Sequence, residues 1–314
     1  MGASSGRSSD RRAAGAPRRR RGPYWTVLVR IAAVAVVLAA AAAAATELAV
    51  SSAGGPQGMI REDSFHAPAL QGRLRFGVYL PPGYGTDRRR YPVVYYLHGL
   101  PATGNAFRAF GFVPAALEQR GLRAIVVAPQ GARDGDSDPE YLDWNPGRNW
   151  ETAIAEELPA YVDAHYRTIR DRRGRALVGI SAGGYGAFLL ALHHLPTFGV
   201  VESWSGYFHP TDPSGTKPLE RGSPEADAFA NAHTLVKDLH ANIDRYPTLI
   251  GFYIGKADDR FLTENIRLNR ELTAARVPHV FRLYPGGHSQ TLWQSEAGTW
   301  LQLAVEHLEA PTKG

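Results

Sequence analysis

The sequence predicts an α/β fold in which a mostly parallel β-sheet is flanked by helices on both faces. Short β-branched and aromatic runs alternate along the chain with longer segments of helical type. The run 92–97, PVVYYL, is apolar throughout, as is typical of a strand that is covered on both sides in a parallel sheet. With 314 residues and 44% hydrophobic content, the chain is large enough for one such domain, which we expect at residues 59–310.

The residues that precede this domain have a different composition. Residues 1–30 hold eight arginines and one aspartate, and the segment 31–50 is mostly alanine, valine and leucine. This order predicts a basic cytoplasmic tail followed by a transmembrane anchor or a cleavable signal segment. Its length favours an uncleaved anchor, whereas Ser51-Ser52-Ala53 offers a small-residue cleavage site. Residues 51–58 are expected to be a linker. The remaining alternative is a basic tail joined to a soluble alanine-rich helix.

Both membrane arrangements predict an extracytoplasmic domain, because positively charged flanks stay in the cytoplasm. The domain is then held at the cell membrane by the N-terminal segment, or secreted if that segment is cleaved. The arginines therefore have an explanation other than nucleic acid. Since the first 30 residues contribute +7 to the formal net charge of +5, the rest of the chain carries −2. We expect no nucleic-acid partner.

Within residues 59–310, local patterns predict the elements. The segment 74–80 alternates apolar and polar residues before Pro81-Pro82-Gly83, as a strand that enters a turn does. The other strands are expected to be short apolar runs at 92–97, 124–128, 175–180, 199–202, 248–254 and 280–284. The longer intervening segments, the first of which has apolar residues at helical spacing, predict helices at 150–166, 182–195, 261–276 and 290–307.

The junction between the strand 175–180 and the helix 182–195 carries the motif Gly179-Ile180-Ser181-Ala182-Gly183. A serine between two glycines at a strand-to-helix corner is typical of a nucleophile elbow. That turn is so tight that side chains two residues before and after the serine would collide with neighbouring backbone. The alternative is a glycine-rich turn with an ordinary serine, but the flanking strand and helix favour the elbow.

A serine nucleophile requires a histidine base and a carboxylate that orients the histidine. In the chain order serine, acid, histidine, the acid is expected after the strand 248–254, where Asp258 and Asp259 follow a glycine. Spacing from that glycine favours Asp258, and Asp259 stays open as the alternative acid. His288 follows the next strand in a glycine-rich loop and is the expected base.

Acyl transfer also requires two fixed N–H donors for the oxyanion. The N–H of Ala182, directly after the serine, is one candidate. The loop after the strand 92–97 has the sequence His98-Gly99-Leu100-Pro101. Leu100 is the expected second donor, because proline has no N–H.

From about residue 60 onward, the chain resembles the putative esterase family. That family includes feruloyl-type carboxylesterases, formylglutathione hydrolases and secreted trehalose mycolyltransferases. The resemblance implies an α/β-hydrolase fold, a triad of Ser181, Asp258 and His288, and an oxyanion hole at Leu100 and Ala182. It rests on four motifs, which are Tyr95 with Leu97-His98-Gly99, Gly179 to Gly184, Gly255 to Asp258, and Tyr284 to His288.

The resemblance therefore implies a serine carboxylic-ester hydrolase that acts through an acyl-enzyme on a small-molecule or cell-envelope ester. The alternative is an acyltransferase of the mycolyltransferase type, which moves an acyl chain to a sugar or lipid hydroxyl. Mycolyltransferases use glutamate as the acid and carry an aromatic residue soon after the histidine-serine pair. The aspartate here and Gln290 after Ser289 favour hydrolysis. A non-catalytic domain kept for binding is a third interpretation.

No cofactor and no metal are expected, because no phosphate loop and no metal-ligand spacing stand out and the sequence has no cysteine. Several aromatic residues have an open role. Tyr141, Trp144 and Trp150 either pack in the core or overhang the active site and bind an aromatic or glycan group. Trp293, shortly after His288, is open to the same two interpretations.

Overall fold

The computed structural model describes residues 57–136, 140–211 and 217–313, and an eight-stranded sheet runs through this part of the chain. The strand order is β1-β2-β5-β4-β6-β7-β8-β9. The pairs β1·β2 and β2·β5 are antiparallel, and all later neighbours in that order are parallel. The predicted mostly parallel sheet is therefore confirmed.

The predicted tail at 1–30, the anchor or signal segment at 31–50 and most of the linker lie outside the described residues. Among the residues that are described, no helix is both long enough and apolar enough to cross a membrane.

Every strand expected from the sequence is present, with ends that shift by up to two residues. For example, β7 extends two residues beyond its expected end to Trp204, which is fully buried. The unexpected strand β1 lies at the sheet edge with most of its residues exposed, so its sequence MIREDSFHA lacks an apolar run. The strands are β1 Met59–Ala67, β2 Gly72–Leu80, β3 Arg89–Arg90, β4 Val93–Leu97, β5 Ile125–Pro129, β6 Arg175–Ile180, β7 Val200–Trp204, β8 Leu249–Gly255, β9 Val280–Tyr284 and β10 Thr312–Lys313.

The predicted helix at 150–166 is divided into α3, a π-helical turn at Ala153–Glu157 and α4. Pro159 lies in the first turn of α4, where its missing N–H breaks the regular hydrogen-bond ladder. The sequence patterns did not indicate α2 or α6 to α8. The helices are α2 Phe112–Gln119, α3 Trp150–Thr152, α4 Leu158–His165, α5 Ala182–His193, α6 Pro224–Phe229, α7 Ala232–Leu235, α8 Leu239–Arg245, α9 Leu262–Ala274 and α10 Gln290–His307.

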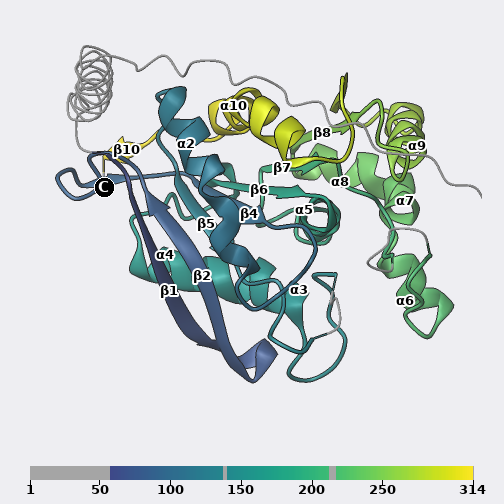
Figure 1. The fold of residues 1–314 in the computed structure, drawn as a ribbon, viewed down its shortest axis with the longest axis horizontal. Coiled ribbons are helices and arrows are strands. Elements are labelled where there is room, and N and C mark those ends of the chain that lie inside the picture. Colours follow the sequence, from purple (N-terminus) through teal and green to yellow (C-terminus); the bar gives the residue numbers. More distant parts are fainter. Residues whose placement is uncertain (1–56, 137–139, 212–216, 314) are drawn as a thin grey trace, which may run out of the picture. The chain divides into compact units, whose positions relative to one another are not determined.

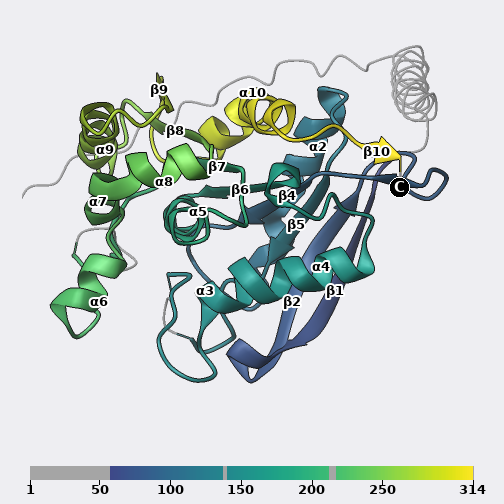
Figure 2. The same ribbon diagram turned by 180° about the vertical axis from the view of Figure 1, so that it is seen from behind.

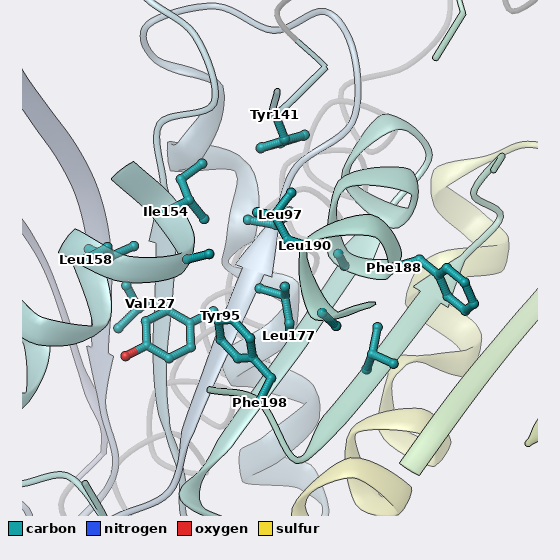
Figure 3. Packing of buried hydrophobic residues seen from close by; sticks show 14 of the residues in the cluster. Tyr95, Leu97, Val127, Tyr141, Ile154, Leu158, Leu177, Phe188, Leu190 and Phe198 are labelled. Atoms are coloured by element: carbon teal, nitrogen blue, oxygen red, sulfur yellow. The ribbon is translucent and has the colours of Figure 1, made fainter. Parts of the chain in front are cut away.

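Helices cover both faces of the sheet, with α2 and α10 on one side and α4 and α5 on the other (Figures 1 and 2). The central strand β4 shows why both faces are apolar. Its Tyr95 and Leu97 pack toward the α4 and α5 side, while Val94 and Tyr96 pack toward the α2 and α10 side. Figure 3 shows the first of these layers, where β4 and β6 side chains meet residues of the helices above them.

The helices that follow the neighbouring strands β4 and β6 lie on opposite faces of the sheet. After β4 it continues through α2 on one face, and after β6 it continues through α5 on the opposite face. The loops that leave these two strands therefore separate, which opens a crevice at their carboxyl ends. Ser181 follows β6 and the loop 98–101 follows β4, so both border this crevice.

Candidate active site

Ser181 lies in a sharp turn directly between β6 and α5. Its backbone has φ 53° and ψ −122°, a conformation that costs about 1–3 kcal/mol in a residue other than glycine. A Cβ atom on Gly179 would lie 2.0 Å from the carbonyl oxygen of Gly183. A Cβ atom on Gly183 would lie 2.1 Å from the carbonyl oxygen of Leu97. Both positions therefore require glycine for a steric reason, as the motif predicts.

The structure brings Ser181, His288 and Asp258 into one hydrogen-bonded array. His288 Nε2 lies 2.8 Å from Ser181 Oγ, and His288 Nδ1 lies 2.7 Å from Asp258 Oδ2. Asp258 is only 1% exposed, and its other carboxylate oxygen accepts a hydrogen bond from Phe261 N–H. Asp259, the alternative acid, is exposed. The geometry thus selects Asp258 as the partner of His288.

Main-chain hydrogen bonds join the loops that carry the acid and the histidine. Lys256 N–H donates to the carbonyl of Tyr284 at 2.8 Å, and Ala257 N–H donates to the carbonyl of Gly286 at 2.9 Å. These bonds continue the parallel pairing of β8 and β9 beyond the ends of both strands. The backbones on either side of the Asp258–His288 contact are therefore fixed to each other.

Two aromatic rings hold the imidazole of His288. Phe261 packs obliquely against it with ring centroids 5.4 Å apart, and Trp293 packs perpendicular to it at 5.0 Å. Trp293 also lines the cavity in front of Ser181 and packs against the core on the side of α10. Tyr141 and Trp150, by contrast, are buried in the core. Of the two interpretations left open by the sequence, core packing is the one that holds for these two residues.

The two expected oxyanion donors lie on either side of the crevice. Ala182 is the first residue of α5, and an N–H at that position has no acceptor within the helix. Leu100 belongs to the loop after β4 and lines the cavity together with Ser181.

His98 fixes the orientation of the Leu100 peptide. Its Nε2 accepts a hydrogen bond from Gly131 N–H at 3.1 Å, so its Nδ1 carries the proton and donates to the carbonyl of Gly99 at 2.8 Å. Burial lowers the pKa of His98, which keeps the ring neutral in this role. In a trans peptide the N–H points opposite to the C=O, so the N–H of Leu100 is directed away from the His98 ring.

A cavity of about 770 Å³ lies in front of Ser181. The loop after β4, the segment 105–109 and several aromatic side chains form its walls, and Arg260 is at its edge. Sequence patterns did not reveal Tyr207 and Thr211 as wall residues. Their only available signal was their position a few residues beyond β7, on the side of the sheet where Ser181 lies.

Comparisons with known proteins agree with this architecture. Residues 67–298 match the sequence pattern of the family described as "Putative esterase". Esterase Rv1288 of Mycobacterium tuberculosis is 34% identical over 142 residues, which are 45% of this chain and 31% of that protein. The MPT51/MPB51 antigen of the same organism is 32% identical over 99 residues, which are 31% of each protein. The chain thus matches less than a third of the length of these relatives.

Solved structures share the fold at lower sequence identity. An S-formylglutathione hydrolase from Agrobacterium tumefaciens has a TM-score of 0.67 at 23% identity, and the match covers 82% of this chain and 98% of that one. A ferulic acid esterase has a TM-score of 0.66 at 24% identity, with 81% and 100% covered. MPT51 (FbpC1) of Mycobacterium tuberculosis has a TM-score of 0.63 at 18% identity, with 80% and 99% covered.

These structural likenesses establish the α/β-hydrolase fold. The family pattern extends from the last residue of β1 into α10 and so includes all the strands that carry the site. The chain belongs to the "Putative esterase" family.

Proposed function

We propose that this protein is a serine carboxylic-ester hydrolase that acts through an acyl-enzyme on Ser181. The observation that carries the proposal is the unbroken hydrogen-bond path from Asp258 through His288 to Ser181, with contacts of 2.7 and 2.8 Å. The strained serine, the buried acid and the two flanking N–H groups support the same assignment. Together they supply a nucleophile, a base, an orienting carboxylate and an oxyanion hole.

In the acylation step, Ser181 Oγ attacks the ester carbonyl carbon while His288 Nε2 accepts the hydroxyl proton. The resulting imidazolium is stabilised by the buried carboxylate of Asp258 at its Nδ1. The N–H groups of Leu100 and Ala182 donate to the oxyanion of the tetrahedral intermediate. The carbon–oxygen bond to the leaving alcohol then breaks, and His288 gives that alcohol its proton.

Deacylation uses the same groups in a second cycle. A water molecule gives a proton to His288 Nε2 and attacks the acyl-enzyme carbonyl, and the acid is released as Ser181 regains its proton. The cavity of about 770 Å³ lies within the usual range for small-molecule sites. Its aromatic wall favours an ester with an apolar or aromatic acyl group. Feruloyl esters are therefore the first substrates to test, since one structural neighbour is a ferulic acid esterase.

The test is ester hydrolysis by the full-length protein beside a Ser181→Ala variant. We expect kcat/KM for p-nitrophenyl acetate and for methyl ferulate to fall by roughly 10⁴-fold or more, because the nucleophile is lost. Ser295→Ala, on an exposed face of α10, is the matched control and should keep full activity. A fluorophosphonate should label Ser181 in the native protein. Activity that survives in Ser181→Ala, or a failure of labelling, would refute the assignment.

The acyltransferase alternative differs only in the nucleophile that attacks the acyl-enzyme, which is a sugar or lipid hydroxyl in place of water. Adding trehalose to the same reaction decides between them, since a transferase forms more acylated sugar than free acid. A hydrolase releases mainly free acid at every sugar concentration.

The extracytoplasmic location is a further part of the proposal. It is supported by the arginine-rich residues 1–30 followed by the apolar segment 31–50. Protease added to intact spheroplasts that express the protein should digest the domain while a cytoplasmic marker survives. Protection of the domain under those conditions would contradict the proposed orientation.

A further inference from the structure

A second group of histidines and carboxylates lies outside the triad, and we call His209, His233, Glu264 and Glu271 the histidine–glutamate cluster. His209 follows β7, His233 belongs to α7, and the two glutamates lie on α9. The helices α7 and α9 are side by side in both views of the fold (Figures 1 and 2). The cluster therefore joins the long connection between β7 and β8 to the helix that follows the acid loop.

One oxygen atom is the centre of the cluster. Glu264 Oε1 lies 2.5 Å from His209 Nδ1 and 3.2 Å from His233 Nε2, and it also accepts a hydrogen bond from Phe208 N–H. The His233 side chain is 3% exposed, that of Glu264 is 13% exposed and that of His209 is 33% exposed. The site is thus buried on one side and reachable from solvent on the other.

We propose that His209, His233 and Glu264 bind a divalent cation of the zinc class. Their ligand atoms all lie within 4.8 Å of one another. Zinc bound to nitrogen and oxygen at its usual tetrahedral distances holds its ligand atoms about 3.3 Å apart. The separation of 3.2 Å between Glu264 and His233 is close to that value, and the 2.5 Å between Glu264 and His209 is shorter, so these two side chains must move apart to admit the ion. Two histidines and one glutamate are a ligand set that zinc accepts.

The surroundings of His233 match those of a metal ligand. Its Nδ1 lies 2.5 Å from Glu271 Oε2, which leaves Nε2 directed at the proposed ion. Glu271 is itself held by Arg267 Nε at 2.7 Å. A carboxylate behind a ligating histidine fixes the ring and its tautomer, and such pairs are a regular feature of protein metal sites. Arg267 is engaged with this carboxylate, so its positive charge is offset at the site.

A hollow beside the cluster leaves room for the remaining coordination position. It has a volume of about 320 Å³ and is lined by His209 and His233. Glu220, Asp227 and Arg267 are in its wall, and because Arg267 is paired with Glu271, the two remaining carboxylates favour a cation there. Three protein ligands with an open position toward such a hollow allow water to complete a tetrahedral site.

The proposed ion would act on the wall of the ester-binding cavity without touching the triad. Tyr207 and Thr211, on either side of His209 in the chain, line that cavity. Phe261, one turn before Glu264, packs on Tyr207 at 4.9 Å and on His288 at 5.4 Å. An ion that ties His209 to Glu264 therefore fixes two parts of one wall to each other. This metal site does not depend on the proposed esterase activity.

The test is zinc binding to the tag-free, full-length protein after removal of metal by a chelator. Titration calorimetry with zinc chloride should show one site per chain, and the thermal midpoint should rise by roughly 5 °C at a hundredfold excess of zinc over Kd. His209→Gln and Glu264→Gln should each weaken binding at least 100-fold. Glu271→Gln, which removes only the support of His233, should weaken it about 10- to 100-fold.

His240→Gln is the matched control, since His240 is an exposed histidine on the neighbouring helix α8. It should leave zinc binding unchanged, and so should Ser181→Ala, which separates this proposal from the esterase assignment. Cobalt(II) should give the visible absorption of a tetrahedral site in the wild type and in His240→Gln, and lose it in His209→Gln. No zinc binding in the wild type, or equal binding in wild type and His209→Gln, would overturn the proposal. Circular dichroism shows whether each variant is folded. If His209→Gln does not fold, the weakened zinc binding of Glu271→Gln tests the proposal in its place.

Discussion

The triad and the histidine–glutamate cluster contain the same pair of groups. In each, a histidine Nδ1 faces a carboxylate, at 2.7 Å between His288 and Asp258 and at 2.5 Å between His233 and Glu271. They differ in the group at Nε2. In the triad it is the hydroxyl of Ser181 at 2.8 Å, and in the cluster it is the carboxylate of Glu264 at 3.2 Å.

That difference determines the chemistry of each region. A hydroxyl can give its proton to Nε2, so the histidine in the triad is placed to act as a base. An ionised carboxylate only accepts, so His233 Nε2 must carry a proton to donate to Glu264, and a cation that binds both groups takes the place of that proton. The same histidine–carboxylate pair can therefore serve in a base or in a metal site, and the group that faces Nε2 decides which.

Of the two histidine–carboxylate pairs, the triad should show the largest loss of activity when its carboxylate is changed. Asp258→Asn keeps the shape of the side chain, but its amide can donate to Nδ1 and so favours the tautomer whose Nε2 already carries a proton. We expect kcat to fall by roughly 10³- to 10⁴-fold with little change in the fold. Steady-state kinetics on p-nitrophenyl acetate would measure the effect. Asp259→Asn, at an exposed position, should retain activity, and the reverse result would exchange the roles of the two aspartates.

A smaller effect is expected at His98, a histidine with two backbone partners and no carboxylate. His98→Ala removes the hydrogen bond that holds the carbonyl of Gly99 and so loosens the Leu100 N–H donor. Because that donor acts mainly in the transition state, we expect kcat to fall roughly 10- to 100-fold while KM changes little. His98→Asn, whose amide can still donate, should recover part of the loss. Equal changes in kcat and KM, or no recovery by asparagine, would indicate that His98 has only a structural role.

The smallest effect on activity is expected at Glu151, whose carboxylate contacts two histidines at the C-terminal end of α5, the end opposite Ser181. Glu151 Oε1 lies 2.7 Å from His193 Nδ1 and 3.1 Å from His194 Nε2. Burial acts to raise the pKa of Glu151, but the hydrogen bonds from both histidines outweigh it and lower the pKa from 4.5 to about 2.

A carboxylate whose pKa is lower in the folded state adds stability above its unfolded pKa, and this stability is lost as pH falls through the folded pKa. Glu151→Gln should therefore reduce the free energy of unfolding by on the order of 3 kcal/mol at pH 7. The difference from wild type should shrink between pH 4.5 and pH 2. Urea unfolding of both proteins across this range would measure it. A difference that stays constant with pH would show that the effect comes from packing.

The sequence alone predicts that Ser181, Asp258 and His288 come together, because all three follow parallel strands of one sheet. Ser181 comes directly after β6, and Asp258 and His288 lie a few residues beyond β8 and β9. The carboxyl ends of parallel strands meet at one edge of a sheet, so chain order alone predicts that these side chains approach each other. The choice between Asp258 and Asp259 required the structure, because adjacent residues in a turn point in different directions.

The histidine–glutamate cluster could not be predicted in the same way. His233 and Glu264 are 31 residues apart, His209 and Glu264 are 55 residues apart, and no repeated ligand spacing marks them. They meet only because α7 folds against α9, and the short helices of that connection have no strong periodicity. The edge strand β1 escaped prediction for a related reason, since a strand with exposed side chains needs no apolar pattern.

The main-chain bonds from Lys256 to Tyr284 and from Ala257 to Gly286 have a consequence for the evolution of this enzyme. Because these bonds use only peptide groups, they survive exchange of the exposed side chains at 256 and 257. Side chains at these two exposed positions can therefore be exchanged without disturbing the contact between Asp258 and His288. A change in loop length is different, since one inserted residue would shift the register and separate the two partners.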